Sequence, residues 1–90
     1  MKTMKEIFDE IRAYVNKNDM NSVVTTNDII IYKGDRFLTL ELNDDIIRCH
    51  EWDFNDKDED YTWWFRENDN QEDMDLVPIA LHESIDPYIL

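Results

Sequence analysis

Residues 29–42, with the sequence IIIYKGDRFLTLEL, decide the predicted fold. Two apolar runs, Ile29–Tyr32 and Phe37–Leu42, stand on either side of Gly34, the only glycine in the chain. Glycine adopts positive φ without steric cost, and a glycine between two apolar runs is typical of a tight hairpin turn. In the second run, leucines alternate with polar residues, which predicts one buried face and one exposed face. The stretch therefore predicts an antiparallel hairpin.

Further strands are predicted on both sides of this hairpin. Val23–Thr26 is short and β-branched, and Ile46–Trp52 follows a polar turn at residues 43–45. A last strand is predicted for Tyr61–Arg66, because aromatic residues and threonine favour strands. The polar residues 53–60 before it are predicted to form a loop. Together these runs indicate an antiparallel meander of four to five strands.

One helix is predicted at each end of the meander. Thr3 and Glu6 have the spacing of a capping box, and a helix over residues 4–17 follows them. Its apolar residues recur with helical period at Ile7, Ile11, Tyr14 and Val15. Pro78 suits the first turn of a short C-terminal helix, residues 77–84. The predicted fold is α+β, with the N-terminal helix packed on the sheet.

Charge is divided unevenly along the 90 residues, a length that predicts a single domain over residues 1–90. Residues 1–40 contain six acidic and six basic side chains, whereas residues 41–90 contain sixteen acidic and three basic ones, giving the net charge of −13. Such a chain is expected to repel nucleic acid and anionic membranes, so it should bind neither directly. No apolar run approaches the ~20 residues of a membrane span. With Cys49 as its single cysteine, we expect a soluble cytoplasmic protein.

One spacing raises the alternative of a calcium-binding module. Asp56, Asp58, Asp60 and Glu67 fall at positions 1, 3, 5 and 12 of a twelve-residue calcium loop. Position 6 of such a loop needs glycine for its sharp turn, and Tyr61 stands there instead. No metal site is therefore predicted, and calcium binding stays the weaker alternative.

The sequence gives little support for a Cys–His metal site or for catalysis. Cys49 and His50 are adjacent, so on a strand they point to opposite faces and cannot easily share a metal. The chain has no glycine-rich phosphate loop, no serine elbow, and no His or Cys with an evident orienting partner. We therefore expect no cofactor and no enzymatic activity.

The acidic half also contains large aromatic residues, which a disordered acidic tail would lack. A net charge of magnitude about 2–8 suffices for solubility, so the excess favours a specific role. Duplex DNA carries one charge per about 1.7 Å, and a face with ten carboxylates would approach that density. The ten candidate carboxylates are Asp53, Asp56, Asp58, Glu59, Asp60, Glu67, Asp69, Glu72, Asp73 and Asp75.

The aromatic residues of the last predicted strand divide into two sets. Tyr61, Trp63 and Phe65 alternate along the strand and are expected to fill the core. Trp64 then points the other way, where either the C-terminal helix covers it or it lies exposed as a protein-binding anchor. Phe54, in the predicted loop, is the second candidate anchor.

This combination of size, charge and order of elements resembles the small acidic DNA-mimic inhibitors of bacteriophages, including anti-CRISPR proteins and inhibitors of the uracil-DNA glycosylase type. The resemblance extends over the whole chain, contains no diagnostic motif and transfers no residue role. It implies a phage protein that occludes a basic nucleic-acid-binding protein, namely a Cas effector nuclease, in the host bacterial cytoplasm. The alternative is an immunity protein for a nuclease toxin, because it would present carboxylates to a similar basic cleft.

Overall fold

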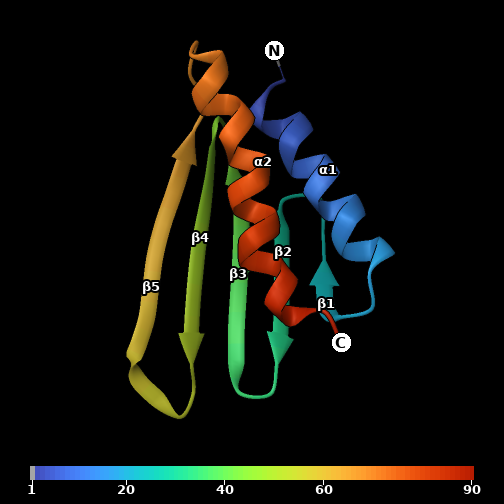
Figure 1. The fold of residues 1–90 in the computed structure, drawn as a ribbon, viewed down its shortest axis with the longest axis vertical. Helices are drawn as coiled ribbons and strands as arrows, with labels where there is room; N and C mark the ends of the chain where they lie inside the picture. The colour runs from blue at the N-terminus through green and yellow to red at the C-terminus, as the bar shows by residue number, and fades with distance from the viewer. Residues whose placement is uncertain (1) are drawn as a thin grey trace.

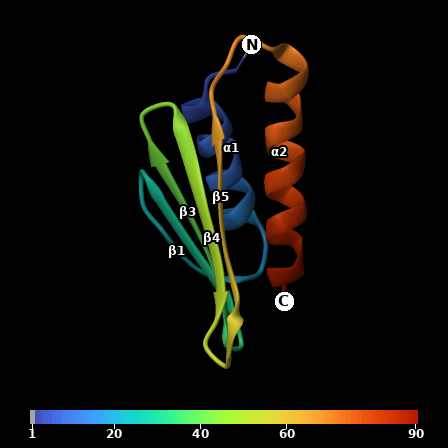
Figure 2. The same cartoon turned by 90° about the vertical axis from the view of Figure 1, so that its left-hand side faces the viewer.

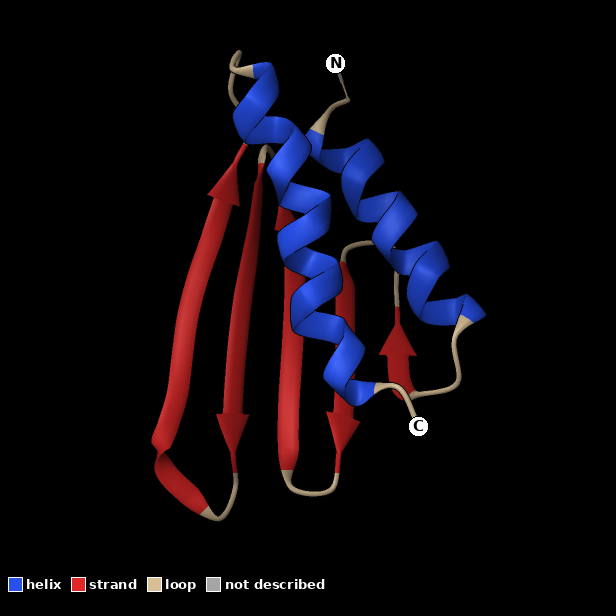
Figure 3. Ribbon diagram, in the orientation of Figure 1, coloured by secondary structure: helices blue, strands red, loops and turns tan. Residues whose placement is uncertain are grey.

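The chain forms two layers, a five-stranded antiparallel sheet and a pair of helices (Figures 1 and 3). The computed structural model describes residues 2–90. The elements are α1 (Met4–Lys17), β1 (Asn21–Val24), β2 (Asp28–Lys33), β3 (Arg36–Asn43), β4 (Ile46–Asp53), β5 (Asp56–Arg66), α2 (Gln71–Ile85) and a short 3₁₀ helix (Asp86–Tyr88). The strands lie side by side in chain order, so the predicted α+β meander with an N-terminal and a C-terminal helix is confirmed.

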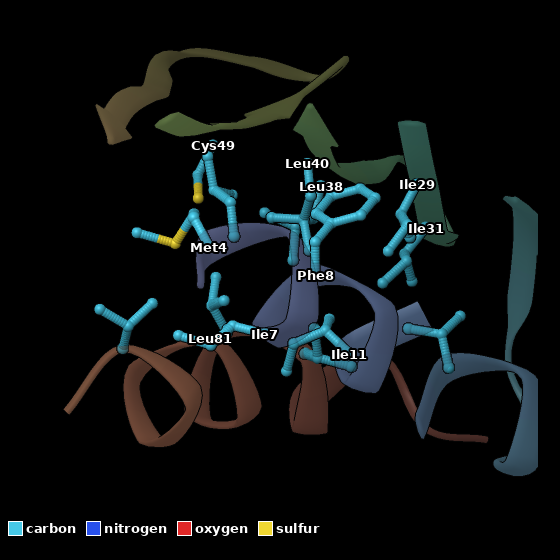
Figure 4. Close-up of a cluster of buried hydrophobic side chains, with 14 of the residues drawn as sticks. Met4, Ile7, Phe8, Ile11, Ile29, Ile31, Leu38, Leu40, Cys49 and Leu81 are labelled. Carbon is cyan, nitrogen blue, oxygen red and sulfur yellow. The ribbon is translucent and has the colours of Figure 1, made fainter. Parts of the chain in front are cut away.

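Both helices lie on the same side of the sheet (Figure 2). The core fills the space between the two layers, where buried strand residues face buried helix residues (Figure 4). The strands contribute Ile29, Ile31, Leu38, Leu40, Ile47 and Cys49, and the helices contribute Met4, Ile7, Phe8, Ile11, Val15, Met74, Val77, Leu81 and Ile85. Because side chains alternate along a strand, the residues between these positions lie on the face that no helix covers. Within residues 2–90, neither helix is long and apolar enough to cross a membrane.

Helix α1 begins and ends at the predicted residues, 4 and 17. The backbone N–H of Glu6 donates to Thr3 Oγ1 at 3.1 Å, and the backbone N–H of Thr3 donates to Glu6 Oε1 at 3.1 Å. A further contact comes from the end of β5, where Glu67 Oε1 accepts the backbone N–H of Met4 at 2.5 Å. Three donors at the start of the helix are thereby satisfied, and α1 is attached to the sheet.

The C-terminal helix is longer than predicted, because it begins at Gln71 and not near residue 77. Pro78 therefore lies inside the helix, where its missing N–H leaves the carbonyl of Met74 without its helical partner. The earlier start is favoured by Asn70, whose side chain accepts the backbone N–H of Asp73 at 3.1 Å. Burial of the apolar face then outweighs the unfavourable proline.

The predicted loop over residues 53–60 is also wrong. The connection is only a turn at residues 54–55, and β5 begins at Asp56. A shift in register near the start of β5 marks a bulge in this acidic segment. Part of its charge is compensated, because Arg36 Nη2 lies 3.0 Å from Glu59 Oε2. Pairing with β4 thus outweighs the low strand propensity of the acidic residues.

Candidate protein-binding surface

The helix-free face of the sheet carries a row of aromatic side chains, which we call the aromatic row: Tyr32, Phe37, Trp52 and Phe54. The first three are cross-strand neighbours on β2, β3 and β4. Their rings stack, with centroids 5.6 Å apart for Tyr32 and Phe37 and 5.2 Å apart for Phe37 and Trp52. Phe54 meets Phe37 edge-on at 5.0 Å. Such aromatic pairs contribute about 0.5–1.5 kcal/mol each beyond the area that they bury.

The row continues toward β5 through polar groups. His50 stacks on Trp52, with ring centroids 4.6 Å apart. Its Nε2 lies 2.7 Å from Asp60 Oδ1, which places that carboxylate beside the aromatic row. One predicted site residue, Asp60, is therefore held on the helix-free face.

The stacking determines what the aromatic row can bind. A platform for nucleobases needs free ring faces, onto which successive bases stack. Here Phe37 lies between the rings of Tyr32 and Trp52, so its faces are occupied within the protein. Trp52 likewise lies between Phe37 and His50, so the middle of the row offers no free ring face for a nucleobase and suits a protein surface better.

The two predicted anchors are both exposed, Trp64 at 64% and Phe54 at 68%. Trp64 lies opposite Arg48 on the helix-free face, so α2 does not cover it. Together with Glu41, Asn43, Ile46, Arg48 and Arg66 it lines a hollow of about 340 Å³. Of the two alternatives for Trp64, the structure shows exposure and not burial beneath α2, whereas no observation tests a role of Trp64 in binding.

The expected core set of β5 is only partly correct. Trp63 and Phe65 are partly buried against the core, as predicted. Tyr61 is 49% exposed, which contradicts the prediction. Helix α2 starts near the end of β5 and runs toward the lower end of β2, away from the middle of β5 (Figure 1). No helix therefore covers Tyr61.

The ten predicted carboxylates fall into two groups at opposite ends of the molecule (Figure 1). The tip group, at the β4–β5 turn, comprises Asp53, Asp56, Asp58, Glu59 and Asp60. The helix-end group, between β5 and the first turns of α2, comprises Glu67, Asp69, Glu72, Asp73 and Asp75. The second half of β5 separates them, because Asp60 and Glu67 are seven residues apart, roughly 23 Å at about 3.3 Å per residue. The ten side chains therefore do not form the single face that the sequence suggested.

Several members of these groups have structural partners. Glu59 pairs with Arg36, and Glu67 accepts the N–H of Met4. Asp75 Oδ1 accepts a hydrogen bond from Gln71 Nε2 at 2.6 Å. The helix-end group also lies where the positive end of the α2 dipole favours negative charge. Local hydrogen bonds and the helix dipole therefore account for negative charge in the helix-end group.

The calcium-loop alternative does not fit this geometry. Asp56, Asp58 and Asp60 belong to a strand, in which alternate residues are about 6.6 Å apart and cannot wrap around one ion. Glu67, the proposed final ligand, is engaged with α1. Among residues 2–90, no group of three or more His, Cys, Asp or Glu side chains is arranged to hold a metal ion.

Cys49 and His50 point to opposite faces, as predicted. Cys49 is fully buried in the core, and this burial raises the pKa of its thiol to about 12. His50 lies on the helix-free face beside Asp60. The pair therefore does not form a joint site.

No protein-family model, curated protein or solved structure matches the chain. The aromatic row, the tip group and Trp64 are the features from which a function can be inferred.

Proposed function

We propose that the protein is a nucleic-acid mimic that inhibits a basic nucleic-acid-binding protein by occupying its groove. The observation that supports this function is the junction between the tip group and the aromatic row. Phe54 lies in the turn between Asp53 and Asp56 and packs edge-on against Phe37. Negative charge and exposed aromatic surface thus meet at one end of the sheet.

Each part of this surface has a separate role in the proposal. Carboxylates attract a basic groove over a distance and accelerate association. Exposed aromatic rings then supply the short-range burial typical of binding hot spots. Phe54 and Trp64 are the proposed anchors, and Phe37 supports Phe54 through their T-shaped contact.

The phosphate-like role is assigned to Asp53, Asp56 and Asp58. Glu59 and Asp60, also in the tip group, are engaged with Arg36 and His50. The three assigned carboxylates form no ion pair among residues 2–90. Asp53 and Asp56 accept only local backbone N–H groups, at 2.8 and 3.0 Å. They therefore keep acceptor sites for a partner's Arg and Lys side chains.

The proposed target is a CRISPR effector nuclease, in line with the resemblance to phage DNA-mimic inhibitors. Such a nuclease holds nucleic acid in a positively charged channel. The helix-end group would meet the same partner only if the channel extends along the whole length of the sheet. A nuclease toxin has a comparable basic cleft, so the experiment must include both classes.

Displacement of labelled DNA tests the proposal on purified guide-loaded Cas nucleases and nuclease toxins. Wild-type protein should displace DNA, and its affinity should fall as salt concentration increases. A variant with Asp53, Asp56 and Asp58 all changed to Lys should bind at least about 100-fold more weakly.

A matched control changes Asp19, Asp45 and Glu83 to Lys, because these exposed carboxylates belong to neither acidic group and their replacement alters the net charge equally. Circular dichroism must show that both variants are folded. If the two variants displace DNA equally well, general negative charge explains the effect and the assigned site is wrong. Displacement from a toxin alone would reassign the target to an immunity function.

A further inference from the structure

Strand β5 is an edge strand, and its outer side is unpaired. The backbone N–H of Glu67 donates to the carbonyl of Asp45 at 2.8 Å, so the backbone at Glu67 faces β4. Backbone polar groups alternate between the two sides of an antiparallel strand. Those of Trp63 and Phe65 therefore also face β4, whereas those of Thr62, Trp64 and Arg66 face outward.

The outward backbone groups have almost no partners in the described part of the chain. Among residues 2–90, the carbonyl of Arg66 accepts one bond, from Asn68 Nδ2 at 3.3 Å. The remaining N–H and C=O groups of Thr62 and Trp64 stay available for another strand. Such an edge is a template for pairing unless the chain blocks it.

Only the first half of β5 carries features that block pairing with another strand. The first half, Asp56–Asp60, is acidic and bulged, and both features discourage edge-to-edge contact. The second half, Tyr61–Phe65, contains neither charge nor proline, and the register shift lies before it. An unprotected aromatic edge of this kind is unusual in a protein that remains monomeric.

The sequence around this edge is nearly symmetric about Trp64. Aromatic residues flank it directly, Trp63 on one side and Phe65 on the other, and Thr62 and Arg66 follow. We propose that β5 pairs antiparallel with β5 of a second copy, with Trp64 at the two-fold axis. The five strands of each copy then form one continuous sheet. This inference does not rest on the proposed function, although Trp64 takes part in both.

The proposed register satisfies the outward backbone groups. Trp64 lies opposite the partner's Trp64, and Thr62 lies opposite the partner's Arg66. These residues all direct their backbone groups outward, so each opposing pair exchanges two hydrogen bonds. On the helix side of the sheet, Trp63 meets the partner's Phe65, which is a favourable aromatic cross-strand pair.

Arg66 is a reason to expect that the strand pairing with β5 belongs to a second copy of this chain and not to an unrelated protein. Within residues 2–90, Arg66 forms no ion pair. In the proposed dimer its diagonal neighbours are the partner's Asp60 and the partner's Trp64, which offer an ion pair and a cation–π contact. Because of the two-fold symmetry, each of these contacts occurs twice in the dimer.

The salt dependence of association distinguishes this dimer from binding to a basic partner. Each copy carries a net charge of −13, and the antiparallel arrangement brings the tip group of one copy toward the helix-end group of the other. Screening of this repulsion should strengthen the dimer. Added salt should weaken binding to a basic partner, so the two associations respond in opposite directions.

Sedimentation velocity of the full chain tests the dimer between about 10 µM and 0.5 mM, because a single shared strand gives a small interface with a Kd of roughly 10–100 µM. The mass should rise from 11.0 kDa toward twice that value, and more steeply at high salt. Thr62→Pro removes an outward N–H without breaking a bond to β4, and Trp64→Lys adds charge at the axis. Both variants should weaken the dimer at least about tenfold.

Val23→Lys is the matched control, because Val23 is 56% exposed on β1, the opposite edge strand of the same sheet. This variant should dimerise as the wild type does. A wild-type chain that stays monomeric up to about 0.5 mM would overturn the proposal. A dimer that withstands both β5 substitutions, or that only Val23→Lys disrupts, would do so as well.

Amide hydrogen exchange provides a test that needs no variant. With increasing protein concentration, the N–H groups of Thr62, Trp64 and Arg66 should become protected. Those of Trp63 and Phe65 should be protected at every concentration, because β4 already holds them. Uniform protection along β5, without this alternation, contradicts the proposed pairing. Thr62→Pro leaves the tip group intact, so it should abolish the dimer and retain partner binding.

Discussion

Replacement of Glu67 by Ala is expected to destabilise the protein although Glu67 belongs to the acidic set first assigned to partner binding. Its Oε1 accepts the backbone N–H of Met4 at 2.5 Å, and Met4 is the first residue of α1. That N–H is one of the helix donors without an intrahelical partner. The side chain of Met4 is completely buried, so water has poor access to the freed donor.

The expected magnitude combines two effects. Loss of an oxygen acceptor at a helix N-terminus costs about 1 kcal/mol. Loss of a negative charge at the positive end of the helix dipole adds about 0.5 kcal/mol. Glu67→Ala should therefore lower the free energy of unfolding by about 1.5 kcal/mol. Glu67→Gln keeps an acceptor but not the charge, so it should lose only about 0.5 kcal/mol, a third as much.

Urea unfolding followed by circular dichroism measures these differences. For a small domain the slope is about 1–1.5 kcal/mol per M, so the midpoint of Glu67→Ala should fall by roughly 1 M. Asp58→Ala, at an exposed tip position, is the control and should leave the midpoint unchanged or raise it slightly by relieving repulsion. Equal midpoints for Glu67→Ala and Asp58→Ala would refute the assignment of Glu67 as a structural cap.

Three further predictions concern the core and the turns. Burial raises the pKa of the Cys49 thiol from its ordinary value of 9.0 to about 12, so above pH 9 the unfolded chain releases this proton first and stability falls as the pH approaches 12. Cys49→Val should remove up to about 2 kcal/mol of this alkaline loss by about pH 11, and an unchanged pH slope in urea midpoints would contradict the prediction. Asp44 has a φ of 54°, so Asp44→Gly should raise the thermal midpoint by relieving about 0.5–1 kcal/mol of strain. Gly34→Ala, at a φ of 60° with nothing within 4 Å of the added Cβ, should cost about 1 kcal/mol, and a neutral result would show that the strain is negligible.

The sequence predicts the fold well where local signals agree with packing. Residues 4–17 combine a capping box with helical periodicity, and Gly34 marks a turn with positive φ. Signals fail where tertiary contacts outweigh them. Acidic residues at the start of β5 discourage a strand, yet β4 pairs with them, and Pro78 discourages a helix interior, yet buried neighbours hold it there.

The candidate site was predictable only in part. Alternation alone shows that Trp63 and Trp64 cannot share a face, but it does not decide whether α2 covers Trp64. The aromatic row was missed, although Tyr32 and Phe37 flank the turn at Gly34 and must be cross-strand neighbours in a tight hairpin. The separation of the ten carboxylates follows from the predicted strand over Tyr61–Arg66, because one group precedes this strand and the other follows it. The structure adds that the strand begins five residues earlier, at Asp56.

The aromatic row also protects the meander against misalignment during folding. A one-residue slip of β3 along β4 would turn Leu38 and Leu40 toward water, and it would separate the rings of Phe37 and Trp52 at the same time. Each side of the sheet therefore enforces the same alignment, although helices cover only one of them. Sheets with one polar face rely on the core alone to fix the register, whereas here the β2–β3 and β3–β4 pairings are fixed from both faces.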